Sequence, residues 1–392
     1  MPHPPAGSCP ICRNSLEPAV YQLRGVPTLD GGVGETREEA LNLPVGDVTL
    51  CLCGTCGWIG NATFDAARLS YEKFHFSLQH SPAFESFVRK LIGDLRATYD
   101  LDGKKVLDVG CGSGDFLRTF ARQAPITGLG VDPSITPGQE DHERGTVTFQ
   151  RGVLEPRHTD LGADLICCRH VLNSMSDPLG LLRQIRAAAG GRQETVFYLE
   201  VPHADRTFRN DILWNLAYEH HSWFNETSFR VLCERAGFEI LSMGPCWGDE
   251  YLGAELRLAD AKPEAVAPAE GVMAARDQLE HFARNVQTIA DRWSRRLAEL
   301  HRTDRRVAIW GAGARALLFL HQVDNKDHVG CVVDISPLRQ GNYLAHIGVR
   351  IDPPDRLVEF RPDLILISNS AFADEIRQQA SVLGLSADFE VF

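Results

Sequence analysis

The sequence predicts an α/β protein with a doubly wound, Rossmann-like parallel sheet, a small amino-terminal domain and a second, carboxyl-terminal Rossmann-like α/β domain. Short apolar runs alternate with helical stretches in two separate parts of the chain, as they do in βα units. A glycine turn follows the first strand of each series, and two C-x-x-C pairs lie near the amino terminus. At 392 residues the chain is also longer than one hydrophobic core usually supports.

Composition and periodicity divide the chain into four parts. We expect a small metal-stabilised domain over residues 1–70, an α/β domain over 71–257, a linker and long helix over 258–302, and a second α/β domain over 303–392. The first part is rich in Cys, Gly and Pro and has little helical periodicity, so a bound metal ion would compensate for its small core.

Seven short apolar runs are predicted strands. They are Lys105–Val109, Thr127–Val131, Asp164–Cys168 and Thr195–Val201 in the first α/β domain, and Arg306–Trp310, Gly330–Asp334 and Asp363–Ser368 in the second. Apolar residues at helical spacing predict a helix within 71–99 and a long amphipathic helix over 273–301, after a linker rich in Ala, Pro and Glu. The alternation in each half favours a parallel sheet.

Charge and hydropathy exclude several classes of partner. The net charge of -12 argues against nucleic acid, because phosphate binding needs a basic face. No apolar run is long enough to span a membrane, and residues 1–7 lack the layout of a signal peptide, so we expect a cytoplasmic protein. Eleven cysteines without such a signal argue against a disulfide framework and favour metal ligation or inert burial.

Two C-x-x-C pairs near the amino terminus predict a structural zinc site. Cys9 and Cys12 form the first pair, and Cys53 and Cys56 form the second. Four thiolates complete a tetrahedral zinc ion, which leaves no position for chemistry. The pairs are further apart than in the commonest zinc ribbons, Cys51 competes with Cys53, and reduced cysteines without metal are the alternative.

The run of residues 106–114, Val-Leu-Asp-Val-Gly-Cys-Gly-Ser-Gly, predicts a loop that binds S-adenosylmethionine (SAM). Three glycines at alternate positions let the backbone bend and approach a ligand, and the amides that open the next helix favour a carboxylate. Asp132 ends the following strand, where a carboxylate suits the hydroxyls of a ribose. The expected cofactor contacts are Tyr71, Ser81, Asp108, Gly110, Gly112, Gly114, Asp132, Leu154 and Arg169. Residues 71–81 form either a lid over the cofactor or interdomain packing.

A polar and aromatic cluster follows the fourth predicted strand. Glu200 and His203 lie at the carboxyl edge of the sheet, and the run Tyr218-Glu219-His220-His221 follows. Histidine accepts a proton near neutral pH, Glu orients it, and a Tyr hydroxyl donates to a developing oxyanion, which together suit enolate chemistry. The alternative is a set of side chains that only pack and hydrogen-bond. Zinc ligation by the two adjacent histidines is disfavoured because helical neighbours point apart.

The second glycine turn, residues 310–316, follows a strand and precedes a helix. Gly311, Gly313 and Ala316 match a dinucleotide fingerprint, and Asp334 ends the next strand, so an NAD-dependent enzyme is one interpretation. A purely structural βα turn is another.

Taken together, these motifs resemble those of the sugar C-methyltransferases. The resemblance covers nearly the whole chain: the cysteine pairs, the cofactor loop, the Tyr-Glu-His cluster and the run of residues 332–341, Val-Val-Asp-Ile-Ser-Pro-Leu-Arg-Gln-Gly. It implies a zinc-binding domain, a class I SAM methyltransferase domain, and a carboxyl-terminal domain that holds a nucleotide-linked sugar. Members of this family typically methylate the carbon beside the keto group of a thymidine-diphosphate 4-keto-6-deoxy sugar.

The resemblance also assigns residues. The family draws its histidine base from an E-H-x-S-[YW]-F segment, here Glu219, His220, Ser222, Trp223 and Phe224. It implies a diphosphate cradle at the second glycine turn, with Arg315 or Arg339 as a charge partner. The chain departs from the family at Ser174, where a V-L-x-H pattern usually has His, and at residues 342–347, which replace a Pro-Gly-Thr turn.

The motifs predict a SAM-dependent methyltransferase, and the resemblance implies a C-methyltransferase of secondary metabolism, such as antibiotic biosynthesis, that acts on a nucleotide-linked deoxysugar. We expect a monomer or homodimer. The expected catalytic residues are His220, Tyr218 and Glu219, and the expected substrate contacts are Glu200, His203, His221, Gly313, Arg315 and Arg339. The alternatives are a methyltransferase with another small-molecule acceptor at C, O, N or S, the NAD-dependent enzyme, and a nucleotide-binding module in which SAM is regulatory.

Overall fold

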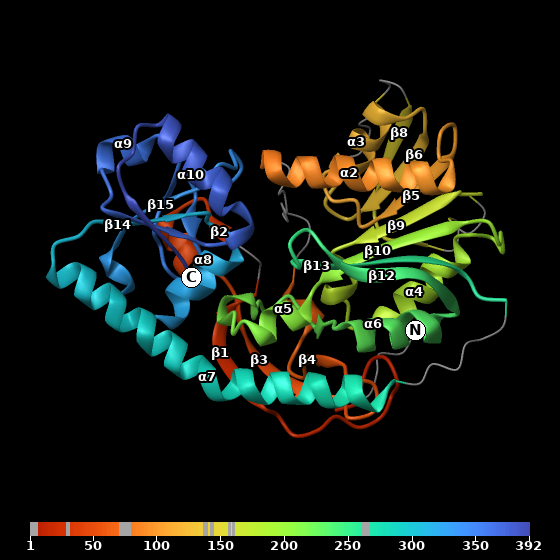
Figure 1. The fold of residues 1–392 in the computed structure, drawn as a ribbon, viewed down its shortest axis with the longest axis horizontal. Helices are drawn as coiled ribbons and strands as arrows, with labels where there is room; N and C mark the ends of the chain where they lie inside the picture. Colours follow the sequence, from red (N-terminus) through yellow and green to blue (C-terminus); the bar gives the residue numbers. More distant parts are fainter. Residues whose placement is uncertain are drawn as a thin grey trace.

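The structure is a computed structural model that describes residues 7–28, 32–69, 80–135, 140–141, 145–155, 158, 161–260 and 267–392. Two α/β regions lie at opposite sides of the molecule, and a small antiparallel sheet and one long helix connect them below (Figure 1). This arrangement leaves the facing edges of the two α/β regions to form a shared site.

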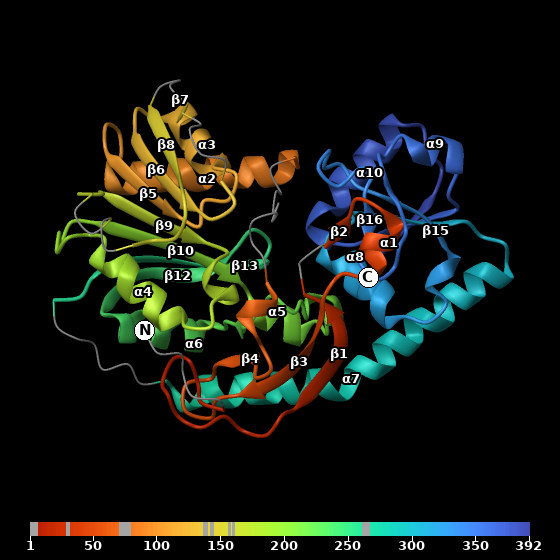
Figure 2. The ribbon, with the colours of Figure 1, turned by 180° about the vertical axis from the view of Figure 1, so that it is seen from behind.

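The amino-terminal region is tied to both α/β regions by strand pairing. Its elements are β1 (Tyr21–Pro27), β2 (Val33–Gly34), α1 (Arg37–Leu41), β3 (Val45–Leu52), β4 (Ile59–Asn61) and η1 (Ala66–Arg68). The four-stranded sheet has the order β1-β3-β4-β11, and its last strand, β11 (Ser222–Trp223), comes from the first α/β region. β2 pairs instead with β16 (Tyr343–Leu344), which places β2 and α1 against the second α/β region (Figure 2).

The first α/β region contains an eight-stranded sheet. Its elements are α2 (Pro82–Tyr99), β5 (Lys105–Val109), α3 (Asp115–Gln123), β6 (Thr127–Asp132), β7 (Glu140–Asp141), β8 (Thr146–Arg151), β9 (Leu165–Arg169), η3 (Leu172–Ser174), α4 (Pro178–Ala187), β10 (Val196–Pro202), α5 (Ala204–Arg209), η4 (Leu213–Asn215), α6 (Glu226–Ala236), β12 (Phe238–Cys246) and β13 (Tyr251–Leu258). The strand order is β12-β13-β10-β9-β5-β6-β8-β7. The central strands are parallel, and the hairpin of β12 and β13 joins β10 in the antiparallel sense.

Helix α2 shows how local sequence sets these elements. Ser81 caps its amino end by accepting a hydrogen bond from the Phe84 amide, and Pro82 occupies the first turn, where its missing N–H costs nothing. The helix buries one apolar stripe and ends at Asp100, which adopts a left-handed conformation. Its amino end therefore lies at a defined position beside the cavity described below.

The second α/β region has its own five-stranded parallel sheet, of order β17-β15-β14-β18-β19. Its elements are β14 (Val307–Trp310), α8 (Ala314–Gln322), η5 (Lys326–His328), β15 (Val329–Val333), β16, β17 (Ile351–Asp352), α9 (Arg356–Phe360), β18 (Leu364–Ile367), η6 (Ser370–Phe372), α10 (Ala373–Val382) and β19 (Asp388–Val391). The long helix α7 (Ala269–Arg302) leads into it. One apolar core cluster joins the amino-terminal sheet, α7 and this second sheet.

Each parallel sheet has one switch point, where successive strands change direction across the sheet. In the first sheet it lies between β5 and β9, and in the second it lies between β14 and β18. Ligands of doubly wound sheets bind in the crevice at the carboxyl ends of the strands beside such a point. The two glycine turns, after β5 and after β14, occupy these two positions.

The α/β class with a Rossmann-like sheet is confirmed, and the seven predicted strands each match an observed strand to within one residue at either end. The long helix predicted over residues 273–301 is α7, which begins four residues earlier, at Ala269. The helix expected within 71–99 begins at Pro82 among the described residues, and Tyr71 lies outside them. No helix in the part of the chain that the structure describes is both long and apolar enough to cross a bilayer.

Candidate active site

A cavity of about 1110 Å³ lies between the two α/β regions and is lined by both. The first region contributes the loop after β5, the end of β6, the turn η3 and residues near His220, and the second contributes the turns after β14, β15 and β18. Binding sites for small molecules usually have volumes of about 300–1,000 Å³. The cavity therefore has room for more than one ligand.

The three glycines of the first turn serve different purposes. All have positive φ angles, of 74° at Gly110, 55° at Gly112 and 86° at Gly114. A Cβ atom at Gly110 would lie 2.2 Å from a methyl group of Val171, and one at Gly114 would lie 2.4 Å from the ring of Phe149. Only Gly112 of the three has no atom within 4 Å of that position, and it lines the cavity. Gly112 is thus the residue at which the backbone is open to a ligand, whereas Gly114 lies outside the lining residues.

Asp132, at the end of β6, fixes the shape of this turn. Its Oδ2 accepts a hydrogen bond from the Gly112 amide at 2.9 Å, and its Oδ1 accepts one from the Ser134 amide at 2.7 Å. Asp132 also lines the cavity. A carboxylate held in this way at the carboxyl edge of a sheet is suited to the hydroxyls of a ribose.

A buried ionic network lies below the turn. Arg169 donates to Glu200 Oε1 at 2.7 Å, and the Tyr198 hydroxyl donates to Glu200 Oε2 at 2.7 Å. Burial alone would raise the pKa of Glu200, but Arg169 outweighs it with help from His170 and Tyr198 and lowers that pKa to about 2. Burial raises the pKa of Asp108 to about 7, although Arg169 opposes this shift.

This network corrects one predicted contact. Glu200 is completely buried and, among the described residues, is not part of the cavity wall. Its role in the structure is to hold Arg169, which does line the cavity and lies over the ring of Phe116 at 4.8 Å. Ser81, Asp108 and Leu154 also line the cavity, so these members of the predicted cofactor set are brought together, although their contacts with a cofactor stay predictions.

The polar run after η4 splits into two groups. Glu219 and His220 line the cavity, and the His220 ring lies edge-on to Trp223 at 5.8 Å between centroids. Tyr218 points instead into the amino-terminal region, where its hydroxyl accepts a hydrogen bond from the Asp65 amide at 3.0 Å. It packs so closely on Gly46 that a Cβ there would lie 2.1 Å from its ring. The catalytic role expected for Tyr218 does not fit this position.

His221 also faces away from the cavity. Its Nδ1 lies 2.8 Å from the Met175 carbonyl oxygen, and its ring packs between Trp58 and Phe64 of the amino-terminal region. Burial lowers the pKa of His221 to about 4, although the hydrogen bond to Met175 opposes this shift. The expected substrate contact at His221 is therefore replaced by a packing role, whereas His203 does line the cavity.

The second α/β region repeats the arrangement of the first turn. The Gly311 amide donates to the Val333 carbonyl at 2.8 Å, as the Gly110 amide does to Val131. Asp334 Oδ2 accepts from the Ala312 amide at 2.6 Å, and its Oδ1 accepts from the Ser336 amide at 2.8 Å. Both turns open into the same cavity, so two nucleotide-type turns face one shared space.

The residues of this second turn that were predicted to contact the substrate line the cavity, but the charge of one of them, Arg315, is already neutralised by Glu250. Gly313, Arg315 and Arg339 all contribute to the wall. Arg315 Nη2 lies 2.6 Å from Glu250 Oε2, while Arg206 Nη2 lies 2.6 Å from Glu250 Oε1. The buried Glu250 carboxylate thus bridges the two α/β regions. Arg315 is consequently a weaker candidate than Arg339 for binding a diphosphate. The Nη1 of Arg339 donates a hydrogen bond to the Ala312 carbonyl.

Several polar residues of this wall were not predicted from the sequence, among them His170 and Glu250. Both lie at the carboxyl edge of the first sheet. His170 comes directly after β9, and Glu250 comes directly before β13, which runs antiparallel to its neighbour β10. Asp132 was predicted because ligands bind at the carboxyl ends of parallel strands, and the same reasoning applies to His170. Glu250 carried no such signal, because its strand was not predicted.

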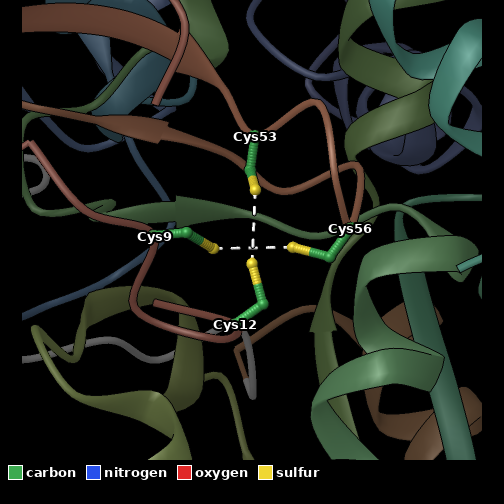
Figure 3. A group of neighbouring side chains, drawn as sticks. All are labelled: Cys9, Cys12, Cys53 and Cys56. Carbon is green, nitrogen blue, oxygen red and sulfur yellow. Dashed lines mark hydrogen bonds between the residues drawn. The ribbon is translucent and has the colours of Figure 1, made fainter. Parts of the chain in front are cut away.

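The four cysteines of the two C-x-x-C pairs converge on one point (Figure 3). Their sulfur atoms all lie within 4.8 Å of one another, with 3.5 Å between Cys9 and Cys56 and 3.4 Å between Cys12 and Cys53. A zinc ion with bonds of about 2.3 Å to sulfur requires sulfur atoms roughly 3.8 Å apart. The cluster therefore fits a tetrahedral metal ion, and Cys51 stays outside it.

Comparisons with known proteins agree with this architecture. A family model described as a methyltransferase domain matches residues 84–243, and one described as a C-methyltransferase C-terminal domain matches residues 265–388. The C-methyltransferase NovU of Streptomyces niveus is 27% identical over 293 residues, which cover 70% of this chain and 68% of that relative.

Other relatives match a smaller part. A ubiquinone biosynthesis O-methyltransferase of Vibrio parahaemolyticus is 33% identical over 108 residues, which cover 24% of this chain and 46% of the relative. The solved magnesium protoporphyrin IX methyltransferase of Synechocystis with bound SAM is 18% identical, covers 45% of this chain and 80% of its own, and superposes with a TM-score of 0.32. The two family matches and the similarity to NovU identify this protein as a SAM-dependent methyltransferase, and its residues 265–388 are similar to the carboxyl-terminal domain of C-methyltransferases.

Proposed function

We propose that this enzyme transfers the methyl group of SAM to the carbon beside the keto group of a nucleotide-linked deoxysugar. The observation that carries the proposal is the shared cavity, in which the SAM-type turn and a second nucleotide-type turn face each other with His220 in the wall. Similarity to NovU over most of the chain supports a carbon acceptor. The volume of about 1110 Å³ accommodates the donor and acceptor together.

In this proposal the turn at Gly112 and the carboxylate of Asp132 hold SAM, which supplies an electrophilic methyl group on sulfur. His220 removes the proton from the acceptor carbon, and the electron pair of that C–H bond moves to the keto oxygen as an enolate. The enolate carbon then attacks the methyl group, the methyl–sulfur bond breaks as the new carbon–carbon bond forms, the keto group is restored, and S-adenosylhomocysteine leaves with the electron pair on sulfur. Alignment of the two reactants in one shared cavity contributes much of the rate.

The proposal includes a structural zinc ion held by Cys9, Cys12, Cys53 and Cys56. The mutual distances of the four sulfur atoms support it. Zinc with four thiolate ligands has no open coordination position, so its part is to stabilise the turns that carry the ligands. Because the knuckle at Cys56 leads into β4, and β4 pairs with β11 next to His220, the zinc site also supports one side of the cavity.

Product analysis tests the proposal. The enzyme is incubated with methyl-labelled SAM and a panel of thymidine-diphosphate 4-keto-6-deoxy sugars, and mass spectrometry with fragmentation locates the added methyl group. An acceptor deuterated at the carbon beside the keto group should lose that deuterium on methylation. A product methylated on O, N or S, with the deuterium retained, would replace this proposal by methyl transfer to a different acceptor.

A further inference from the structure

His170 lines the cavity but has no part in the chemistry described so far. It follows β9 directly, and its side chain is 14% exposed. Its φ angle is +58°, in the left-handed region that non-glycine residues rarely adopt. Such a conformation is costly unless the surroundings hold it, and residues of this kind cluster at functional sites.

Glu200 holds the imidazole from the side away from the cavity. His170 Nε2 lies 2.8 Å from Glu200 Oε1, and Glu200 is itself anchored by Arg169 and Tyr198. The carboxylate at that distance positions the ring, and a neutral imidazole has one nitrogen that can accept a hydrogen bond. Burial lowers the pKa of His170, although Glu200 opposes the shift, so the neutral ring is favoured.

The His170 ring belongs to the part of the cavity between the two α/β regions. It lies edge-on to Tyr251 at 4.3 Å, and Tyr251 stacks on Trp247 at 5.4 Å. Trp247 in turn contacts Phe372 of the second α/β region at 5.2 Å. His170 is therefore in contact with an aromatic cluster to which both regions contribute, and two members of this cluster, Tyr251 and Phe372, line the cavity with it.

We propose that His170 is a second catalytic residue of this enzyme, which accepts a hydrogen bond from a hydroxyl group of the acceptor close to the reacting carbon and so orients that carbon toward the methyl donor. This inference rests on the proposed function and adds a requirement to it, namely that the acceptor carries a hydroxyl near the keto group.

The test combines a variant with a modified acceptor. His170→Ala and His170→Asn are compared with the wild type on thymidine-diphosphate 4-keto-6-deoxyglucose and on its 2-deoxy and 3-deoxy analogues, and SAM affinity is measured by calorimetry. We expect His170→Ala to lower kcat/KM for the full acceptor about tenfold, the effect of one lost hydrogen bond, without changing the Kd for SAM. Removal of the recognised hydroxyl should lower kcat/KM by the same factor in the wild type and by no further factor in His170→Ala.

The control is His301→Ala, since His301 is exposed, lies at the far end of α7 and, within the described segments, stacks on His328 outside the cavity wall. This variant should keep wild-type kinetics. The assignment would be overturned if each missing hydroxyl lowered kcat/KM by the same factor in His170→Ala as in the wild type. It would also be overturned if the variant bound SAM more weakly while its KM for the acceptor stayed unchanged. If the wild type methylates a different kind of acceptor, the proposed function fails. The same comparison of variant and wild type, made on that acceptor and on its analogues without single hydroxyl groups, still decides whether His170 contacts the acceptor.

Discussion

The Glu250 carboxylate lies between two guanidinium groups from different parts of the chain, with Arg315 Nη2 2.6 Å from one oxygen and Arg206 Nη2 2.6 Å from the other. Glu250 and Arg206 belong to the first α/β region, and Arg315 belongs to the second. All three side chains are at least 85% buried. This cluster joins the two halves of the cavity wall.

Glu250→Gln should therefore destabilise the protein. The change leaves Arg206 and Arg315 close together with no neutralising charge, and breaking a buried ion pair typically costs about 3–5 kcal/mol. We expect the midpoint of urea unfolding to fall accordingly. Glu239→Gln is the matched control, because Glu239 pairs with Arg257 on the exposed hairpin, and it should change stability little. Equal effects of both variants would contradict the bridging role of Glu250.

Gly112→Ala should weaken SAM binding at least tenfold while the protein stays folded. The added methyl group would project into the open space where the cofactor is expected, and alanine at the φ of 55° costs roughly 1–2 kcal/mol of stability. Gly103→Ala controls for that strain, since Gly103 has a φ of 75° and an equally open surrounding but lies away from the cavity. Calorimetric titration with SAM should separate the two variants. Similar affinities would show that the turn at Gly112 does not contact the cofactor.

The buried His221 should make the protein less stable in acid. Its pKa is about 4 in the folded state and about 6.5 in the unfolded chain, so the unfolded chain takes up a proton first as the pH falls. The stability present above pH 6.5 is thus lost progressively down to about pH 4, by roughly 3 kcal/mol in all. In His221→Gln this part of the pH dependence should vanish, which unfolding curves at several pH values will reveal. Parallel pH profiles of the two proteins would be the contrary result.

Cys56→Ser should release the proposed zinc ion. Three remaining thiolates bind zinc far more weakly, and the knuckles of small metal-binding domains usually lose their fold with the metal. The purified variant should contain almost no zinc by elemental analysis and should unfold at a lower temperature. Cys51→Ser is the control, because Cys51 is buried nearby but outside the cluster. If elemental analysis found no zinc in the purified wild-type protein, the proposed metal site would be wrong.

The parts of the fold that follow local rules were predictable from the sequence. β5 was predicted at its exact bounds because an apolar run ends there in a glycine turn. The hairpin of β12 and β13 was missed, since β12 is largely exposed and its polar residues, such as Glu239 and Ser242, interrupt the apolar pattern. The pairing of β2 with β16 joins residues 33–34 to 343–344, a contact that no local pattern encodes.

The same division holds for the site. Gly112 and Asp132 were found because a turn and a strand end place them at one sheet edge regardless of the rest of the chain. Tyr218 and His221 were misplaced, because their side chains are directed by contacts with Asp65, Phe64 and Trp58, which are distant in sequence. Adjacent residues on a chain can face opposite sides, and only the packed amino-terminal sheet decides which of them reaches the cavity.

Single-turnover kinetics of His220→Asn test most directly whether His220 removes a proton from the acceptor carbon. With enzyme, SAM and a 4-keto-6-deoxy sugar nucleotide in heavy water, the variant should bind SAM as the wild type does. Its methyl transfer and its exchange of deuterium into unreacted acceptor should both be slower by about 10²–10⁴. Methyl transfer at the wild-type rate in this variant would contradict the account.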